Sequence, residues 1–157
     1  MDRVVRFIEN SVMEGTPFFA TVWFHTPHLP VVAGPKYTRI YAAHEKYAQH
    51  YYGCITAMDE QVGRLRMELR ALGVADNTLV TFCSDNGPEG QANSAPGTAG
   101  HLSGRKRSLL EGGIRVPGLI EWPGKVRPGN TIIPAVTSDY LPTILGIIGA
   151  ESLEKRP

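Results

Sequence analysis

The sequence has little cysteine, no excess of one charge and no long apolar run. Its two cysteines, Cys54 and Cys83, lie far apart and make no metal-ligand spacing. One falls in a helical pattern and one in a strand pattern, so we expect two reduced, buried thiols. A formal net charge of +1 argues against a general polyanion binder, so no nucleic-acid partner is expected. No apolar run approaches the roughly 20 residues of a membrane span, and the first residues lack the apolar core of a signal peptide. We expect no membrane partner, and the compartment is not readable from the sequence.

The 157 residues suit one compact domain over 1–157, and their 42% hydrophobic and 20% charged content is that of a globular protein. Apolar residues at helical spacing predict three helices, and β-branched or aromatic runs predict three strands. The helices are expected at 3–13, 42–72 and 139–148, and the strands at 18–24, 78–83 and 114–122. The run at 18–24 is expected to be covered on both faces. This order predicts an α/β fold with a mostly parallel sheet flanked by helices.

A cluster of polar residues follows the strand expected at 78–83. Asp85 and Asn86, within Ser-Asp-Asn-Gly, place a carboxylate and an amide carbonyl where an open α/β sheet binds its ligands. Oxygen ligands of this kind suit a hard cation such as Ca²⁺ or Mg²⁺. The same four residues would also make an ordinary Asx turn.

Two further loops are expected at the same sheet edge. His25 and His28 lie between prolines after the strand at 18–24, and Lys106 stands between two arginines after a long Gly- and Pro-rich loop at 87–104. A basic triplet alone is typical of a solvated patch. Together, a divalent cation, the Lys106 ammonium and a protonated His28 would surround a tetrahedral oxyanion, sulfate or phosphate. His28 would also donate a proton to the leaving oxygen.

Several segments resemble the type I (arylsulfatase-like) sulfatases of the alkaline phosphatase-like superfamily. The resemblance covers nearly the whole chain, with its motifs in the family's order. These segments are FFATVWFHTPHLP at 18–30, MDEQVG at 58–63, SDNGPE at 84–89, GRKRSLLEGGIRVP at 104–117, WPG at 122–124 and YLPTIL at 140–145.

The resemblance implies a role for each loop. Asp85 and Asn86 correspond to ligands of an active-site Ca²⁺, while Lys106 and His28 correspond to catalytic residues that contact the sulfate ester. The substrate implied is a small sulfate ester or a sulfated glycan. Glu111 and Arg115 are interpreted as an ion pair that pins a Gly-Gly turn. Asp59 is interpreted as a helix residue rather than a metal ligand.

One part of the family's pattern is missing from the sequence. These sulfatases make a formylglycine from Cys or Ser in a Cys/Ser-x-Pro/Ala-x-Arg motif, and neither Cys54 nor Cys83 fits it. We therefore expect the chain to be the second half of a catalytic domain, with formylglycine in a missing N-terminal half. Alone, it would be inactive and would self-associate through exposed sheet surface. The alternatives are a phosphatase or phosphodiesterase of the same superfamily, or a non-catalytic anion-binding module.

Overall fold

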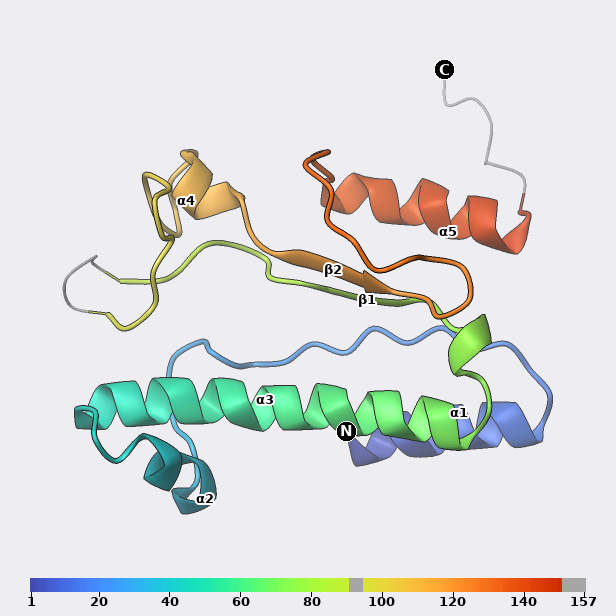
Figure 1. Cartoon of the computed structure of the whole chain (residues 1–157), viewed down its shortest axis with the longest axis horizontal. Coiled ribbons are helices and arrows are strands. Elements are labelled where there is room, and N and C mark those ends of the chain that lie inside the picture. The colour runs from blue at the N-terminus through green and yellow to red at the C-terminus, as the bar shows by residue number, and fades with distance from the viewer. Residues whose placement is uncertain (91–94, 151–157) are drawn as a thin grey trace. The chain divides into compact units, whose positions relative to one another are not determined.

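The computed structural model describes residues 1–90 and 95–150. These residues form two compact units that divide between Val126 and Arg127, and each is considered by itself. Figure 1 labels the main elements. The first unit contains α1 (Asp2–Met13), α2 (Pro35–Thr38), η1 (Arg39–Tyr41), α3 (Lys46–Ala71), η2 (Ala75–Asn77), β1 (Val80–Cys83), α4 (Glu111–Ile114) and β2 (Gly118–Glu121). The second contains η3 (Thr137–Asp139) and α5 (Tyr140–Ile148).

The two long helices expected in the first unit are confirmed as α1 and α3. The buried side chains Val5 and Ile8 lie on one face of α1, at the spacing of an amphipathic helix. An ion pair between Asp2 and Arg64 links α1 to α3. Gly73 follows the end of α3, and its φ of 71° is the left-handed conformation that favours glycine after a helix.

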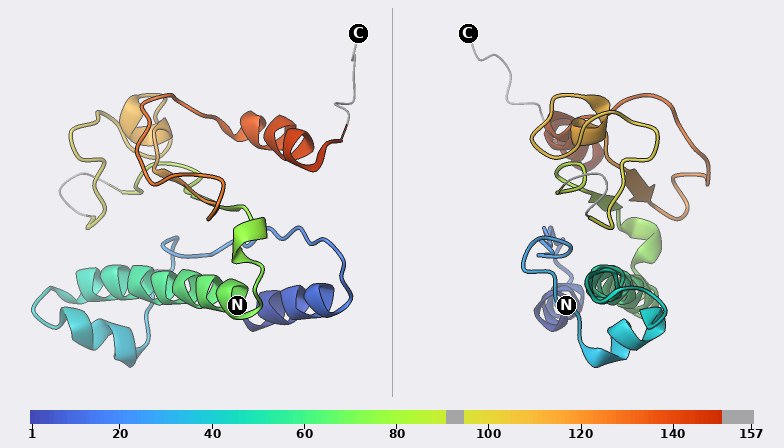
Figure 2. Two further views of the ribbon diagram at one scale, coloured as in Figure 1. Left: turned by 45° about the vertical axis from the view of Figure 1, so that its right-hand side comes forward. Right: turned by 90° about the vertical axis from the view of Figure 1, so that its left-hand side faces the viewer.

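Residues 18–24 are not the buried strand that the sequence predicts. This segment is an extended connection that runs along α3 (Figures 1 and 2), and no strand in the described part of the chain pairs with it. Phe18 and Phe24 are half-buried, whereas Phe19 and Trp23 are 71% and 91% exposed. The prediction fails because a strand needs hydrogen-bonded neighbours and a second layer, and the described residues supply neither on that side.

The described residues of the first unit contain one small sheet, the hairpin-like pair of β1 and β2. The two strands are antiparallel, with Val80 opposite Glu121 and Cys83 opposite Gly118. The α/β class is confirmed, but the parallel pairing expected for these strands is wrong. Their connection, residues 84–117, contains only the single-turn α4 among its described residues and returns the chain antiparallel, whereas a parallel pair needs a full crossover.

The cysteine prediction is half right. Both thiols are free, and Cys54 is buried in α3, where burial raises its pKa. Cys83 is exposed, because the two-stranded sheet leaves one of its faces uncovered at this position.

Charged side chains connect α3 to the strand pair. Glu121, at the end of β2, accepts hydrogen bonds from Arg66 Nε at 2.5 Å and Nη2 at 2.9 Å, and one from Arg70 Nη2 at 3.2 Å. The indole Nε1 of Trp122 donates to the carbonyl of Asp76 at 3.0 Å. These contacts fix the strand pair against the carboxyl end of α3.

The second unit confirms the final helix expected near 139–148. Asp139 precedes α5, and its Oδ2 accepts a hydrogen bond from the amide of Val136 at 2.8 Å. Pro142 lies in the first turn of α5, where its missing N–H costs no helical hydrogen bond. Across residues 1–90 and 95–150, none of the helices has the length and apolarity that crossing a membrane requires.

Candidate active site

The loop after β1 carries Asp85 and Asn86, as the sequence predicts. Ser84 Oγ donates to the Asn86 carbonyl at 2.9 Å, which closes a tight turn. The Gly87 amide then donates to the Gly113 carbonyl at 2.9 Å. Asp85 is exposed, and within the described residues its carboxylate has no hydrogen-bond or ion-pair partner. The loop thus presents an accessible carboxylate beside an amide.

Glycines allow this loop, the turn of α4 and the segment at 104–108 to pack with their backbones in close contact. A Cβ on Gly87 would lie 1.9 Å from the Gly112 carbonyl oxygen, and one on Gly112 would lie 2.2 Å from the Gly104 oxygen. A Cβ on Gly113 would lie 2.1 Å from the Ser108 oxygen. Any side chain at these positions would push the segments apart. The Gly-Gly turn of α4 therefore joins the Asp85–Asn86 loop to the loop that carries Lys106.

The ion pair expected beside this turn is present. Arg115 Nη1 lies 3.0 Å from Glu111 Oε2, so the pair joins the first residue of α4 to the residue that follows its end. Asp59, interpreted as a helix residue, lies in α3 and is exposed.

Lys106 is held by both its backbone and its side chain. Its amide donates to the Pro88 carbonyl at 3.1 Å, which fixes the lysine loop to the chain that follows Gly87. Its Nζ lies 3.4 Å from Glu89 Oε2, and the side chain is 23% exposed. Arg107 Nη1 lies 2.6 Å from the other oxygen of Glu89. The hydrogen bond from Arg107, and more weakly that from Lys106, lowers the pKa of Glu89.

Arg105 anchors the long loop rather than extending a solvated patch. Its Nη2 donates to the carbonyls of Glu89, at 2.9 Å, and Gly97, at 2.7 Å. The Nε of the same guanidinium is buried with no hydrogen-bond partner among the described residues. All three residues of the basic triplet thus contact Glu89, Arg105 through its backbone carbonyl and the other two through its carboxylate. Residues 91–94 of the expected 87–104 loop lie outside the described residues.

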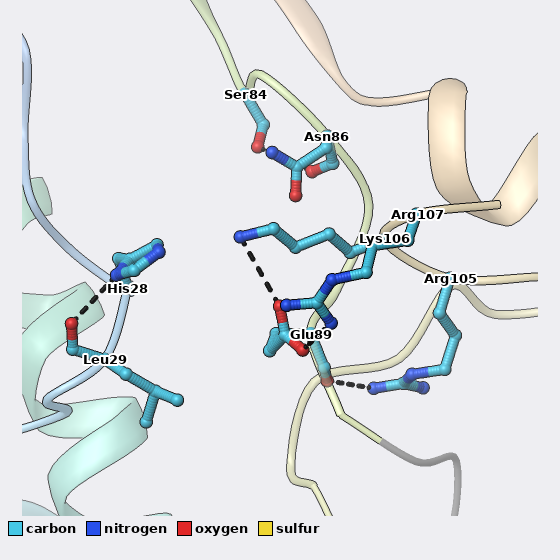
Figure 3. A network of polar contacts seen from close by, with 8 residues as sticks. All are labelled: His28, Leu29, Ser84, Asn86, Glu89, Arg105, Lys106 and Arg107. Atoms are coloured by element: carbon cyan, nitrogen blue, oxygen red, sulfur yellow. Dashed lines mark hydrogen bonds and ion pairs between the residues drawn. The ribbon is translucent and has the colours of Figure 1, made fainter.

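His28 is fixed by the carbonyl of the next residue. Because that carbonyl only accepts, His28 Nδ1–H donates to Leu29 O at 2.8 Å, and His25 Nε2–H donates to the same oxygen at 3.1 Å. The His28 amide also donates to the His25 carbonyl at 2.8 Å. This leaves Nε2 of His28 as the ring nitrogen available to a ligand. Figure 3 shows the ring turned toward Lys106.

The structure brings the predicted residues of the three loops toward one place. In Figure 3 the side chains of His28, Asn86 and Lys106 point toward one another, with Glu89 directly beside Lys106. Asp85 adjoins Asn86 in the same turn. No group of three or more His, Cys, Asp or Glu side chains within residues 1–90 and 95–150 is arranged to hold a metal ion. The metal-binding role of Asp85 and Asn86 therefore stays a prediction.

Glu89 received no role of its own from the sequence. The signal was present, since Glu89 ends the SDNGPE segment that carries the resemblance. The sequence does not reveal that this carboxylate contacts two of the three basic residues at 105–107.

An ammonium, an imidazole and oxygen ligands on neighbouring loops of an α/β unit are typical of enzymes that act on esters of tetrahedral oxyanions. The sulfatase family model matches residues 1–150, and the chain belongs to the sulfatase family.

Relatives of known sequence and structure agree with this assignment. The chain is 36% identical to human arylsulfatase A over 90% of its own length and 35% identical to rat steryl-sulfatase over 87%. The crystal structure of Ps i-CgsB in complex with k-i-k-neocarrahexaose matches 96% of the chain with a TM-score of 0.88 and 32% identity. The chain spans 27%, 24% and 33% of these three proteins.

Proposed function

We propose that this chain is the part of a sulfuric ester hydrolase that binds the sulfate group. The observation that carries the proposal is the direct attachment of the Lys106 loop to the Asp85–Asn86 loop, in a chain of the sulfatase family. Lys106 donates a backbone hydrogen bond directly to Pro88. Gly87 donates one to Gly113 in α4, and Gly112 of the same turn donates to Ser103, just before the lysine loop. It keeps a cation and two oxygen ligands on one rigid frame.

Lys106 and His28 have different roles in this proposal. The Lys106 ammonium binds sulfate oxygens and stabilises the negative charge that develops on them in the transition state. His28 presents Nε2, because Nδ1–H is engaged by Leu29 O, and the protonated ring donates Nε2–H to the leaving oxygen. Both side chains are therefore substrate-binding and catalytic.

Asp85 and Asn86 are proposed as calcium ligands. The chemistry of the donors fits, because a carboxylate without a partner among the described residues and an amide carbonyl are hard oxygen ligands. A bound Ca²⁺ would add positive charge next to the sulfate oxygens. Two protein ligands make a weak site, so further ligands are expected from outside these residues.

The substrate class proposed is a sulfated glycan, with a small sulfate ester as the alternative. Support for a glycan comes from the k-i-k-neocarrahexaose complex of one relative and from a 34%-identical ulvan-active sulfatase of Formosa agariphila. Support for a small ester comes from the similarity to steryl-sulfatase.

We also propose that the 157 residues alone do not turn over sulfate esters, because no formylglycine motif occurs among them. The exposed apolar side chains of the 18–24 segment and of β2 favour self-association of the isolated chain. They include Phe19, Trp23, Leu119 and Ile120.

Phenyl sulfate titrated into the ¹⁵N-labelled chain tests the sulfate-binding role. We expect resonances of residues 84–89 and 104–107 to shift, and Lys106→Ala to weaken binding by about tenfold or more, the effect of losing one charge-assisted contact. Lys36→Ala is the matched control, since Lys36 pairs with Glu60 between α2 and α3. Equal affinities of Lys106→Ala and the unaltered chain would refute the proposal.

A further inference from the structure

Three consecutive basic residues contact a single acidic residue, Glu89. Arg105 donates to its backbone carbonyl, while Lys106 and Arg107 lie against its two carboxylate oxygens. Arg107 has a φ of 74°, a left-handed conformation that is uncommon outside glycine. Figure 3 shows the neighbouring Lys106 and Arg107 side chains both reaching Glu89. Charge at this point of the site is therefore set by the cluster of Glu89 and the two cations that contact its carboxylate, Lys106 and Arg107, and not by Lys106 alone.

The two ion pairs of this cluster are unequal. Arg107 Nη1 lies 2.6 Å from Glu89 Oε1, a short charge-assisted hydrogen bond, whereas Lys106 Nζ lies 3.4 Å from Oε2. Glu89 therefore neutralises Arg107 first, and the Lys106 ammonium keeps its capacity to bind another anion. One carboxylate and two cations leave a net charge of +1 in the cluster.

An anion that binds Lys106 lies close to the Glu89 carboxylate. An oxygen at hydrogen-bond distance from Nζ, about 2.8 Å, is at most about 6 Å from Glu89 Oε2. That separation is shorter than the Debye length of about 10 Å at 0.1 M salt, so the repulsion is only partly screened. A doubly charged anion experiences this repulsion twice as strongly as a singly charged one.

We propose that Glu89 is a specificity-determining residue that makes this site prefer singly charged sulfate monoesters over doubly charged phosphate monoesters. The two esters are alike in tetrahedral shape, so charge is the property by which a site can separate them. The inference rests on the proposed function, because it takes Lys106 as the residue that binds the ester. Removal of the Glu89 charge raises the cluster from +1 to +2, which suits a dianion.

The test compares phenyl sulfate with phenyl phosphate at about pH 8, where the phosphate ester is a dianion because its second pKa is about 6. Both are titrated by NMR into the unaltered chain, Glu89→Gln, Glu89→Asp and Glu60→Gln. Glu89→Gln is expected to shift the ratio of the two dissociation constants toward phenyl phosphate by about tenfold. Glu89→Asp keeps the charge and is expected to retain the preference for phenyl sulfate. Glu60→Gln removes an equivalent charge from the Lys36 pair and is expected to leave the ratio unchanged.

A ratio is the informative quantity, because loosening of Lys106 would weaken attraction of the dianion more than that of the monoanion and so move the ratio toward phenyl sulfate, opposite to the expected shift. An unchanged ratio in Glu89→Gln, with binding still lost in Lys106→Ala, would overturn the role of Glu89 alone. A ratio that moves toward phenyl sulfate would overturn it as well. Binding of both esters that survives Lys106→Ala would instead overturn the proposed function.

Discussion

The amide of Gly87 donates to the carbonyl of Gly113 at 2.9 Å, and this one hydrogen bond joins the turn after β1 to the turn of α4. The contact has no room for a side chain, since a Cβ on Gly87 would lie 1.9 Å from the Gly112 oxygen. Residues that are 26 positions apart thus share one frame, with the proposed metal ligands on one side and the lysine loop on the other.

Gly87→Ala is expected to destabilise the chain by about 1–3 kcal/mol, because the added methyl collides with backbone that cannot rotate away. Urea unfolding followed by circular dichroism measures the change. Gly63→Ala is the matched control. Gly63 lies within α3, and a Cβ added there would meet nothing within 4 Å, so alanine should stabilise the helix by about 0.5–1 kcal/mol. Equal stabilities of Gly87→Ala and the unaltered chain would show that the turns are free to separate.

The sequence pattern predicted the helices correctly, because the backbone hydrogen bonds of a helix form within one segment of the chain. Helices α1, α3 and α5 follow from apolar spacing and from Gly73 and Asp139 at their ends. The segment at 18–24 has the composition of a strand, but strand structure depends on partners that composition does not supply. Composition likewise does not specify the direction in which two strands pair, so the parallel pairing predicted for β1 and β2 was wrong.

The candidate site was predictable in its parts but not in its contacts. The positions of Asp85, Asn86, Lys106 and His28 came from motifs that end at loops. The contacts of Glu89 with Lys106 and Arg107, which are 17 and 18 positions away in sequence, depend on a left-handed residue and on close glycine packing. Neither the spacing of apolar residues nor the composition of the sequence predicts such a contact.

Neutral His28 is expected to carry its proton on Nδ1, because Leu29 O accepts from that nitrogen at 2.8 Å. Long-range ¹H–¹⁵N correlation spectra at high pH distinguish the two tautomers by the ¹⁵N shifts of the ring. A dominant Nε2–H form would contradict the proposed orientation of His28. His50 is a useful internal comparison, since its Nδ1 accepts the amide of Ala33 at 3.1 Å and its proton must lie on Nε2.

Acid is expected to weaken the connection between β2 and α3. The hydrogen bond from Arg66 lowers the pKa of Glu121, so this group binds protons less readily in the folded chain than in the unfolded one. The stability that the ionised Glu121 adds to the folded chain is fully present above the unfolded carboxyl pKa of about 4.3. It is lost as the pH falls through the lower pKa of the folded state. Glu121→Gln should therefore unfold with a smaller pH dependence below about pH 4.3 than the unaltered chain.

The size of this effect is expected to stay below about 1 kcal/mol at neutral pH, because the pair is partly exposed and screened by water. Urea midpoints measured from about pH 3 to pH 7 provide the curve. Glu111→Gln is the control, since its partner Arg115 directly follows α4, the helix that Glu111 begins, and the pair joins no separate elements. Identical pH curves for Glu121→Gln and the unaltered chain would mean that the Arg66 contact does not form in solution.

Calcium is expected to bind the isolated chain weakly, with a dissociation constant on the order of 10⁻³ M, because only Asp85 and Asn86 are proposed as protein ligands. Titration with CaCl₂ should shift the amide resonances of residues 84–87 in fast exchange. Asp85→Asn removes the only charged ligand proposed and should abolish these shifts. Asp59→Asn removes an exposed carboxylate from α3 and should leave them unchanged. Tight stoichiometric binding by calorimetry, or shifts that survive Asp85→Asn, would assign the calcium ligands to other residues.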